Sequence, residues 1–271
     1  MLHNAKRWLT ACAAVMALGA SLTCSAQQPA KPAKAPKDWA KIEKYAAAND
    51  SVRHARNNGR RVVFIGNSIT CGYGSEAKSQ WVHYSYDNSN HYYSYAAILA
   101  RELNAEEMCV ARSGIGVYRN YGGHEEGQTM TRWYDYTCLY DSTQLWDFSR
   151  FRPDVICVNL GTNDLSTKGY DINLYKSAYK KFIQHLAKVQ PKAKIVILTS
   201  QMLSKTAKQL QIATLKEVYA ELHKQGLNVY YFELDIQDPK LGYGADWHPS
   251  KAQHQQAARQ LLPFLRGLLS K

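Results

Sequence analysis

The segment RVVFIGNSIT, residues 61–70, joins an apolar run to a glycine and a short polar sequence. The β-branched run 61–65 is typical of a strand buried on both faces, as in a parallel sheet covered by helices. Gly66 permits a tight turn where this strand ends. Ser68 then falls at the start of the next helical turn, with its hydroxyl exposed and its own N–H pointing outward. This arrangement suits a nucleophile, and it equally suits an ordinary strand-to-helix junction with a capping serine.

Four further apolar runs follow along the chain, and segments with helical periodicity separate them. Alternating strands and helices predict an α/β protein, a three-layer α/β/α sandwich with about five parallel strands. In the last predicted helix, Ser250 is the expected N-cap, and Pro263 is expected to kink the helix or end it early. Strands are predicted at 61–65, 108–111, 155–160, 194–199 and 229–232, and helices at 94–103, 174–189, 208–224 and 250–269.

Three other polar clusters follow predicted strands or lie in the last loop, where sites form in open parallel sheets. They are SGIG at 113–116, GTND at 161–164 and DWHP at 246–249. A glycine N–H can approach a ligand closely, an asparagine amide can donate to developing charge, and a histidine can act as a general base. Each cluster alone has an ordinary explanation as a turn or a surface histidine. Together with Ser68 they supply a nucleophile, two oxyanion donors and a base, which is the set that acyl transfer requires.

In this order the four clusters resemble those of the SGNH, or GDSL-type, hydrolases, over residues 61–271. Finer features are similar to the second family of carbohydrate esterases, secreted enzymes that remove acetyl groups from plant polysaccharides such as xylan and glucomannan. The resemblance implies the flavodoxin-like SGNH hydrolase fold, an acetylxylan esterase-like serine esterase active in polysaccharide degradation, and no cofactor. The finer features are GNSITCGYG at 66–74, YRNYGG at 118–123, WDFS at 146–149 and GYGADWHPS at 242–250.

Carried over by position, the resemblance makes Ser68 the nucleophile and His248 the base. It assigns the oxyanion hole to the Ser68 N–H, the Gly116 N–H and the Asn163 side-chain amide. Gly114 is the alternative glycine, and Gly116 is preferred because the superfamily glycine aligns with the later position. No metal is expected, because the nine histidines show no metal-binding spacing such as His-Glu-x-x-His.

Two positions depart from the family pattern. Asn67 stands where most relatives have an aspartate beside the serine, which keeps the size and one acceptor but removes the charge. The superfamily usually carries its acid three residues before the histidine, and that position is Ala245 here. Asp246, two residues before His248, is the candidate for orienting the imidazole. A backbone carbonyl is the alternative, and it leaves a Ser–His dyad.

Aromatic residues are concentrated in the segments around the predicted site. Ten of the 19 tyrosines lie between residues 73 and 136, and Trp247 adjoins the predicted base. Aromatic faces stack on sugar rings, while the polar tips of tyrosine and tryptophan bind hydroxyl groups. We expect most of these side chains to pack loops onto the sheet and a few, Trp247 first, to contact an acetylated carbohydrate substrate.

The first 26 residues have the pattern of a secretory signal peptide. Lys6 and Arg7 precede an apolar run of 15 residues at 8–22, whereas a membrane-spanning helix needs roughly 20. Cleavage is expected after Ala26; a lipoprotein beginning at Cys24 is the alternative, and residues 21–23 are a poor context for lipid attachment. Residues 27–60 are expected to form a linker and N-terminal segment, followed by the hydrolase domain at 61–271. The expected location is secreted or periplasmic, without a membrane span.

The net charge raises the question of a nucleic-acid partner. Lys and Arg number 34 against 22 Asp and Glu, which gives a formal charge of +12. Five of these charges belong to residues 1–44, so seven remain on residues 45–271. The sequence contains no basic run interleaved with aromatic residues, and we expect no nucleic-acid partner and no obligate protein partner.

Two other functions remain open on the sequence alone. The first is an SGNH esterase for other acyl esters, such as a lysophospholipase or thioesterase; the absence of a long apolar lid segment argues against lipid substrates. The second is a non-catalytic carbohydrate-binding protein built on a hydrolase scaffold, which the alanine at position 245 would suit.

Overall fold

The computed structural model describes residues 59–123 and 128–270. The predicted signal peptide at 1–26 lies outside these residues, as does almost all of the predicted linker at 27–60. Within the described ranges, no helix combines the length and the apolar composition that a membrane span requires.

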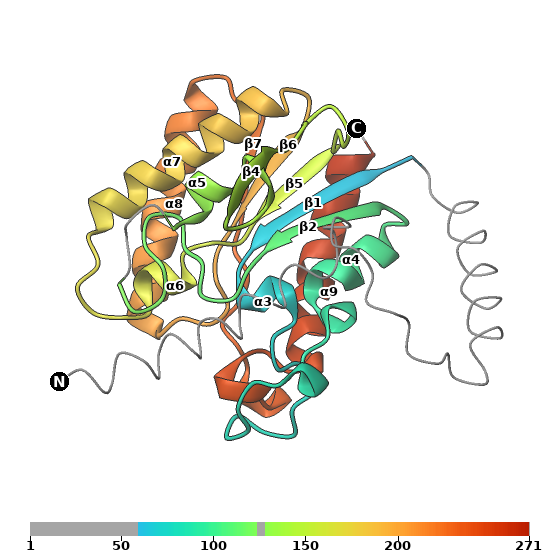
Figure 1. Cartoon of the computed structure of the whole chain (residues 1–271), viewed down its shortest axis with the longest axis vertical. Helices are drawn as coiled ribbons and strands as arrows, with labels where there is room; N and C mark the ends of the chain where they lie inside the picture. The colour runs from blue at the N-terminus through green and yellow to red at the C-terminus, as the bar shows by residue number, and fades with distance from the viewer. Residues whose placement is uncertain (1–58, 124–127, 271) are drawn as a thin grey trace. The chain divides into compact units, whose positions relative to one another are not determined.

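Five parallel strands form one sheet in the order β2-β1-β5-β6-β7 (Figure 1). In the inner strand β1, Val62, Phe64 and Ile65 are fully buried, as their β-branched and aromatic side chains predict. The predicted parallel sheet is therefore confirmed. Its strands are β1 (Arg61–Gly66), β2 (Glu106–Ala111), β5 (Val155–Val158), β6 (Lys194–Leu198) and β7 (Val229–Phe232).

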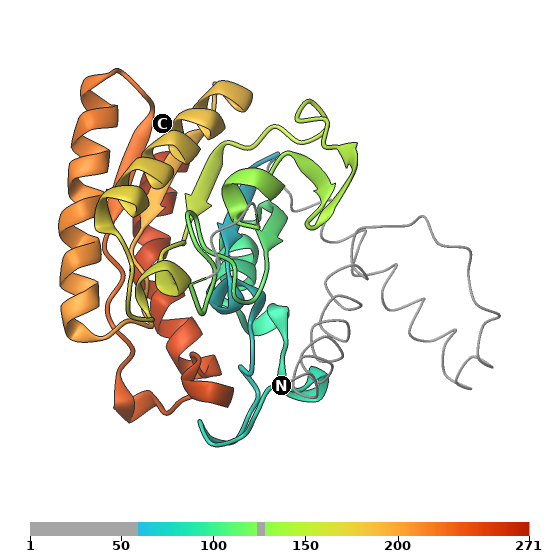
Figure 2. The same cartoon turned by 60° about the vertical axis from the view of Figure 1, so that its left-hand side comes forward.

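Two pairs of long helices cover the two faces of this sheet. Helices α4 and α9 pack together on one face, where their apolar side chains join Val62, Phe64 and Cys157 in one core. Helices α7 and α8 pack side by side on the other face, seen in yellow and orange in Figures 1 and 2. This arrangement confirms the predicted three-layer α/β/α sandwich. The helices are α4 (Tyr95–Glu102), α7 (Ile172–Val189), α8 (Lys205–Lys224) and α9 (Lys251–Leu269).

The expectation that Pro263 ends the last helix early is wrong, because α9 continues to Leu269. Pro263 lies on the exposed side of the helix, where water can hydrate the carbonyl that loses its N–H partner. On the opposite side, Leu261 and Leu265 are fully buried in the core shared with α4. Burial of this apolar face maintains the helix through the proline. As predicted, Ser250 caps its N-terminus by accepting a hydrogen bond from the Gln253 N–H.

The segment Trp133–Trp146 belongs to a compact unit separate from the one that holds Asn57–Arg132 and Asp147–Lys271. In it, strands β3 (Tyr136–Cys138) and β4 (Asp141–Leu145) pair antiparallel. The rings of Trp133 and Tyr140 stack with their centroids 5.0 Å apart. The sequence did not predict this hairpin, because β4 is exposed along its whole length and has no buried apolar pattern.

Short helices occupy several of the connections, and those near the carboxyl ends of the strands carry the candidate site. They are α3 (Ser68–Cys71), α5 (Met130–Trp133), α6 (Thr162–Leu165), η1 (Tyr86–Asn88), η2 (His91–Tyr93), η3 (Pro239–Leu241) and η4 (Ala245–Trp247).

Candidate active site

Three of the four predicted clusters follow neighbouring strands. Ser68 begins α3 directly after β1, the SGIG sequence follows β2, and Asn163 lies in α6 after β5. Because β2, β1 and β5 are adjacent and parallel, their carboxyl ends meet at one edge of the sheet. The chain order reverses between β1 and β5, and such a switch point is where open α/β sheets form their binding sites.

Ser68 and His248 are brought together although 180 residues separate them. The Ser68 Oγ lies 2.9 Å from the His248 Nε2. Asn67 starts the short helix that holds the serine, because its Oδ1 accepts a hydrogen bond from the Ile69 N–H at 3.1 Å. This N-cap role uses one side-chain oxygen and needs no charge. The substitution of asparagine for the family's aspartate therefore preserves the local start of the helix.

Main-chain carbonyls hold the other side of the His248 ring. Its Nδ1 lies 3.1 Å from the Ala245 oxygen and 3.2 Å from the Asp246 oxygen. A carbonyl oxygen can only accept, so Nδ1 carries the hydrogen and the lone pair of Nε2 faces Ser68. Burial lowers the pKa of His248 to about 4, against the opposite effect of the two carbonyls. The ring is therefore neutral at neutral pH and can accept a proton from the serine.

The carboxylate of Asp246 forms its hydrogen bonds with groups other than the His248 ring. It accepts hydrogen bonds from the Tyr73 hydroxyl at 2.8 Å and the Tyr84 N–H at 3.0 Å, and it lies 2.8 Å from the His83 Nδ1. Of the two alternatives that the sequence left open, the geometry favours the backbone carbonyl, because the hydrogen bond between Asp246 and the imidazole is made by its main-chain oxygen. Asp246 has a φ of 49°, in the left-handed region, which is uncommon for a residue other than glycine.

Tyr73 is a site residue that the sequence did not single out. Its ring stacks on the His248 ring with centroids 3.9 Å apart and an interplanar angle of 26°. The Asp246 carboxylate fixes its hydroxyl. Tyr73 lies five residues after Ser68, among many other tyrosines, and nothing in its spacing separates it from those neighbours.

The loop that carries His248 is joined to the loop after Ser68 by main-chain hydrogen bonds. The Ala245 N–H donates to the Gly74 oxygen at 3.0 Å, and the Asp246 N–H donates to the Val82 oxygen at 3.2 Å. A Cβ on Gly74 would lie 2.4 Å from the Ala245 Cβ, so only glycine allows this approach. Ala245 is fully buried at the contact. A larger side chain at position 245 would therefore have to displace these buried neighbours.

The expectation that Gly116 provides an oxyanion donor is not supported by its geometry. Its N–H donates to the Asn120 Oδ1 at 3.0 Å, and a Cβ would lie 1.9 Å from the Arg119 oxygen. Gly116 is therefore a buried packing glycine. Gly114 has a φ of +79°, is partly exposed, and its N–H makes no hydrogen bond to another residue in the described part of the chain.

The Asn163 amide lies at the same loop as these glycines. Its Nδ2 donates one hydrogen to the Ile115 oxygen at 2.8 Å. An amide nitrogen carries two hydrogens, so this bond orients the group and leaves the second hydrogen for a ligand. The Asn163 amide, which follows β5, thus lies at the loop after β2.

Asp164 fixes the loop after β2 by hydrogen bonds to its main chain. Its carboxylate is buried and accepts hydrogen bonds from the N–H groups of Val117, Tyr118 and Arg119, at 2.8 to 3.2 Å. The Arg119 Nε donates in turn to the Asp164 main-chain oxygen at 2.8 Å. Burial raises the pKa of Asp164 to about 6, although the backbone donors favour the charged form.

Two exposed tryptophans lie beside the Ser68–His248 pair. Trp247, the residue before the histidine, is 46% exposed, and Trp81 is 72% exposed. Their rings meet edge to face with centroids 5.2 Å apart. Tyr84 and Tyr86 extend this aromatic surface. In the described residues, one group of side chains brings possible metal-ligand atoms close together in space. It consists of His91, Glu107 and Cys109 and includes none of these four aromatic residues.

The sequence of this chain is similar to those of known carbohydrate-active proteins. The chain is 42% identical over 211 residues to the cellulase/esterase CelE of Acetivibrio thermocellus, a match that covers 78% of this chain and 26% of that protein. It is 29% identical over 218 residues to an acetylxylan esterase/glucomannan deacetylase of Cellvibrio japonicus, covering 78% of this chain and 57% of that protein. The chain thus spans about a quarter of the first relative and just over half of the second.

Solved structures give the same picture. A family two carbohydrate esterase from Clostridium thermocellum, in complex with cellohexaose, matches with a TM-score of 0.74 and 42% identity, over 78% of this chain and 65% of that one. The model of the GDSL-like lipase/acylhydrolase family matches residues 64–256, a span that contains Ser68, Asn163 and His248. This chain therefore belongs to the GDSL-like lipase/acylhydrolase family, with family two carbohydrate esterases among its structural neighbours.

Proposed function

We propose that this protein is a serine esterase that removes O-acetyl groups from plant-type polysaccharides or oligosaccharides such as xylan and glucomannan. One observation carries the proposal: the Ser68 hydroxyl lies 2.9 Å from a histidine nitrogen whose lone pair is directed at it by main-chain carbonyls. The names of the relatives support the substrate class, because they include an acetylxylan esterase/glucomannan deacetylase.

In the first step, the Ser68 Oγ attacks the acetyl carbonyl carbon while the His248 Nε2 takes the hydroxyl proton. The imidazolium that forms is stabilised by the Ala245 and Asp246 oxygens, which accept from its Nδ1–H. The C–O bond to the sugar then breaks, and His248 returns its proton to the leaving sugar oxygen. In the second half, His248 takes a proton from water while the water oxygen attacks the acetyl carbonyl carbon. The bond from that carbon to the Ser68 Oγ then breaks, His248 returns the proton to Oγ, and acetate leaves.

The negative oxygen of each tetrahedral intermediate needs preorganised donors. We assign these to the N–H of Ser68, the second amide hydrogen of Asn163 and a glycine N–H after β2. Gly114 is preferred over the expected Gly116, because the Gly116 N–H is already bonded to Asn120. Each such donor raises kcat by a factor of about 10²–10³.

The exposed aromatic surface supports a carbohydrate substrate. Trp81 and Trp247 present ring faces and edges beside the serine, and aromatic rings pack against the apolar faces of sugars. Neither bears a charge, which suits a neutral polymer. The signal-like sequence at 1–26 agrees with export toward such a polymer, and N-terminal sequencing of the mature protein tests cleavage after Ala26.

The test is acetate release from acetylated xylan, acetylated glucomannan and an aryl acetate, with residues 27–271 and matched variants. Ser68→Ala and His248→Ala should each lower turnover at least ~100-fold. His83→Ala is the control for histidine loss, because His83 is exposed and contacts the Asp246 carboxylate rather than the serine. Undiminished turnover in Ser68→Ala would end the proposal. Activity on the aryl acetate alone would move the substrate away from carbohydrate.

A further inference from the structure

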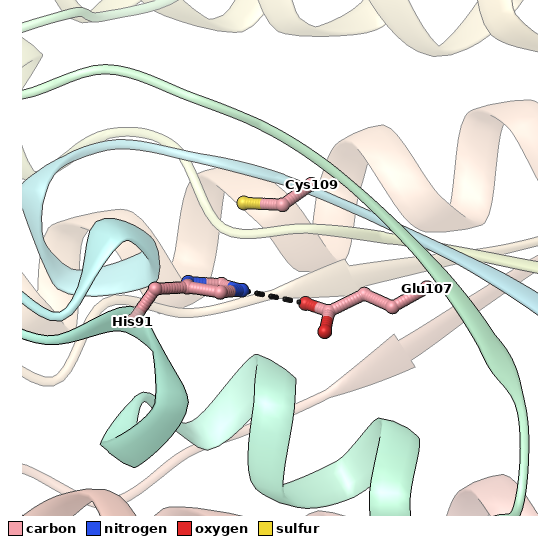
Figure 3. Close-up of side chains that lie close together, drawn as sticks. All are labelled: His91, Glu107 and Cys109. Carbon is pink, nitrogen blue, oxygen red and sulfur yellow. Dashed lines mark hydrogen bonds and ion pairs between the residues drawn. The ribbon is translucent and has the colours of Figure 1, made fainter. Parts of the chain in front are cut away.

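A second cluster of reactive side chains lies on the edge strand of the sheet. Glu107 and Cys109 are two residues apart on β2 and so project from the same face of the strand. His91, from η2, points into the same space (Figure 3). The ligand atoms of the three side chains all lie within 4.8 Å of one another. No residue of the Ser68–His248 site belongs to this group.

The hydrogen bonds of His91 place an unprotonated ring nitrogen opposite the Glu107 carboxylate. The Nδ1 of His91 lies 3.0 Å from the Thr70 main-chain oxygen, which can only accept, and 3.3 Å from the Ser94 Oγ, which is able to accept as well, so this nitrogen carries a hydrogen. Its Nε2 lies 2.9 Å from the Glu107 Oε1. Two lone pairs at this separation require a cation between them, either a proton or a metal ion.

Metal-binding histidines have this arrangement, with one ring N–H donated to a carbonyl and the other nitrogen free to coordinate. The thiol of Cys109 adds a sulfur ligand, which hard ions such as Mg²⁺ and Ca²⁺ do not select. Nitrogen, sulfur and carboxylate oxygen together suit Zn²⁺, in a tetrahedral site whose fourth position is open to water. With Zn–ligand bonds of about 2.0–2.3 Å, the ligand atoms of a tetrahedral site lie about 3.5 Å apart. Side-chain rotations that move these atoms by roughly 1 Å bring the three of them to that separation.

We propose that His91, Glu107 and Cys109 form a binding site for a divalent zinc-like ion. The side chains of His91 and Glu107 are 33% and 19% exposed, so an ion can reach the site from solvent. Bound there, the ion joins the segment before α4 to the edge strand. It also strengthens the hold of His91 on the Thr70 oxygen, which lies in α3, the helix that Ser68 begins.

The test is Co²⁺ titration of the full chain, reduced and freed of metal with a chelator. Wild type should bind one Co²⁺ per chain and develop a thiolate-to-cobalt charge-transfer band, which Zn²⁺ then abolishes. Cys109→Ser should lose the band, and His91→Ala and Glu107→Gln should weaken binding at least ~10-fold. Zn²⁺ should raise the unfolding temperature of wild type and leave that of Cys109→Ser unchanged.

Glu106→Gln is the matched control on the same strand, because Glu106 forms its ion pair with Arg61 at 3.0 Å. It should bind Co²⁺ as wild type does. Circular dichroism without metal identifies any variant that fails to fold. If His91→Ala unfolds because it lacks the hydrogen bond to Thr70, the test rests on Cys109→Ser and Glu107→Gln. A charge-transfer band that persists in Cys109→Ser, or no band in wild type, would overturn the proposal.

Discussion

Replacing Asp246 with asparagine separates the two ways in which His248 can be oriented. The main-chain oxygens of Ala245 and Asp246 contact the imidazole, and this substitution leaves both in place. We therefore expect kcat/KM for an aryl acetate to fall by less than ~10-fold. In a triad whose acid holds the histidine, the same change costs ~10⁴ in kcat, or about 5.5 kcal/mol. The two cases differ by about three orders of magnitude.

Stability should respond more than rate. The Asp246 carboxylate accepts from the Tyr73 hydroxyl and the Tyr84 N–H, and its side chain is 32% exposed. Hydrogen bonds to a charged group contribute about 1.5–3 kcal/mol and neutral ones about 0.5–1.5 kcal/mol. Because asparagine retains one acceptor and solvent reaches the site, we expect the free energy of unfolding to fall by about 1–2 kcal/mol.

The assay is kcat/KM for 4-nitrophenyl acetate together with urea unfolding of the same samples. Tyr73→Phe serves as a companion, because it keeps the ring on His248 and removes only the hydroxyl that Asp246 binds. A double-mutant cycle should give a coupling in unfolding free energy with little coupling in rate. A loss near 10⁴ in Asp246→Asn, with the protein still folded, would refute dyad orientation by the main chain.

Three further outcomes are expected. Because burial lowers the pKa of His248 to about 4, kcat/KM should rise with pH through about 4 and level off above it; a midpoint at the ordinary 6.5 in the pH–rate profile would contradict this. Trp81→Ala and Trp247→Ala should each raise KM for acetylated polysaccharide ~5- to 10-fold and leave the aryl acetate nearly unaffected, as parallel assays on both substrates will test. Gly74→Ala should lower the urea-unfolding free energy by more than ~2 kcal/mol, whereas Gly242→Ala, also at positive φ but in open space, should lose only about 1–2 kcal/mol; equal losses would contradict the close packing at Gly74.

The sheet and the helices on it were predictable because burial leaves a periodic pattern. The segment 229–232 was predicted as a strand with the bounds that β7 has. The edge strand was predicted too short, as 108–111, because Glu106 and Glu107 begin β2 with polar side chains. Both β2 and β7 are edge strands, but β7 consists of apolar and aromatic residues throughout, whereas β2 begins with two glutamates.

The pairing of Ser68 with His248 was predictable from residue type and order, because strand ends of one sheet meet at one edge. The sequence left the partner of the histidine open between the Asp246 carboxylate and a backbone carbonyl, because main-chain oxygens are present at every position and leave no mark in the sequence. Gly116 was preferred over Gly114 by alignment, whereas the burial of Gly116 and its hydrogen bond to Asn120 are visible only in the structure. The cluster around Cys109 was also missed, because its ligands come from two segments without a metal-binding spacing.

The main-chain contacts of His248 have a consequence for redesigning the protein. A base held by a carboxylate depends on one residue, whereas a base held by carbonyls depends on the path of a loop. That path is set by Gly74 and Gly244, where the two loops approach too closely for any side chain. Side chains at the rim, Trp247 among them, can therefore be exchanged to alter substrate range while the proton-transfer geometry is retained. To transplant this chemistry to another scaffold, the loop with its glycines must be moved as a unit.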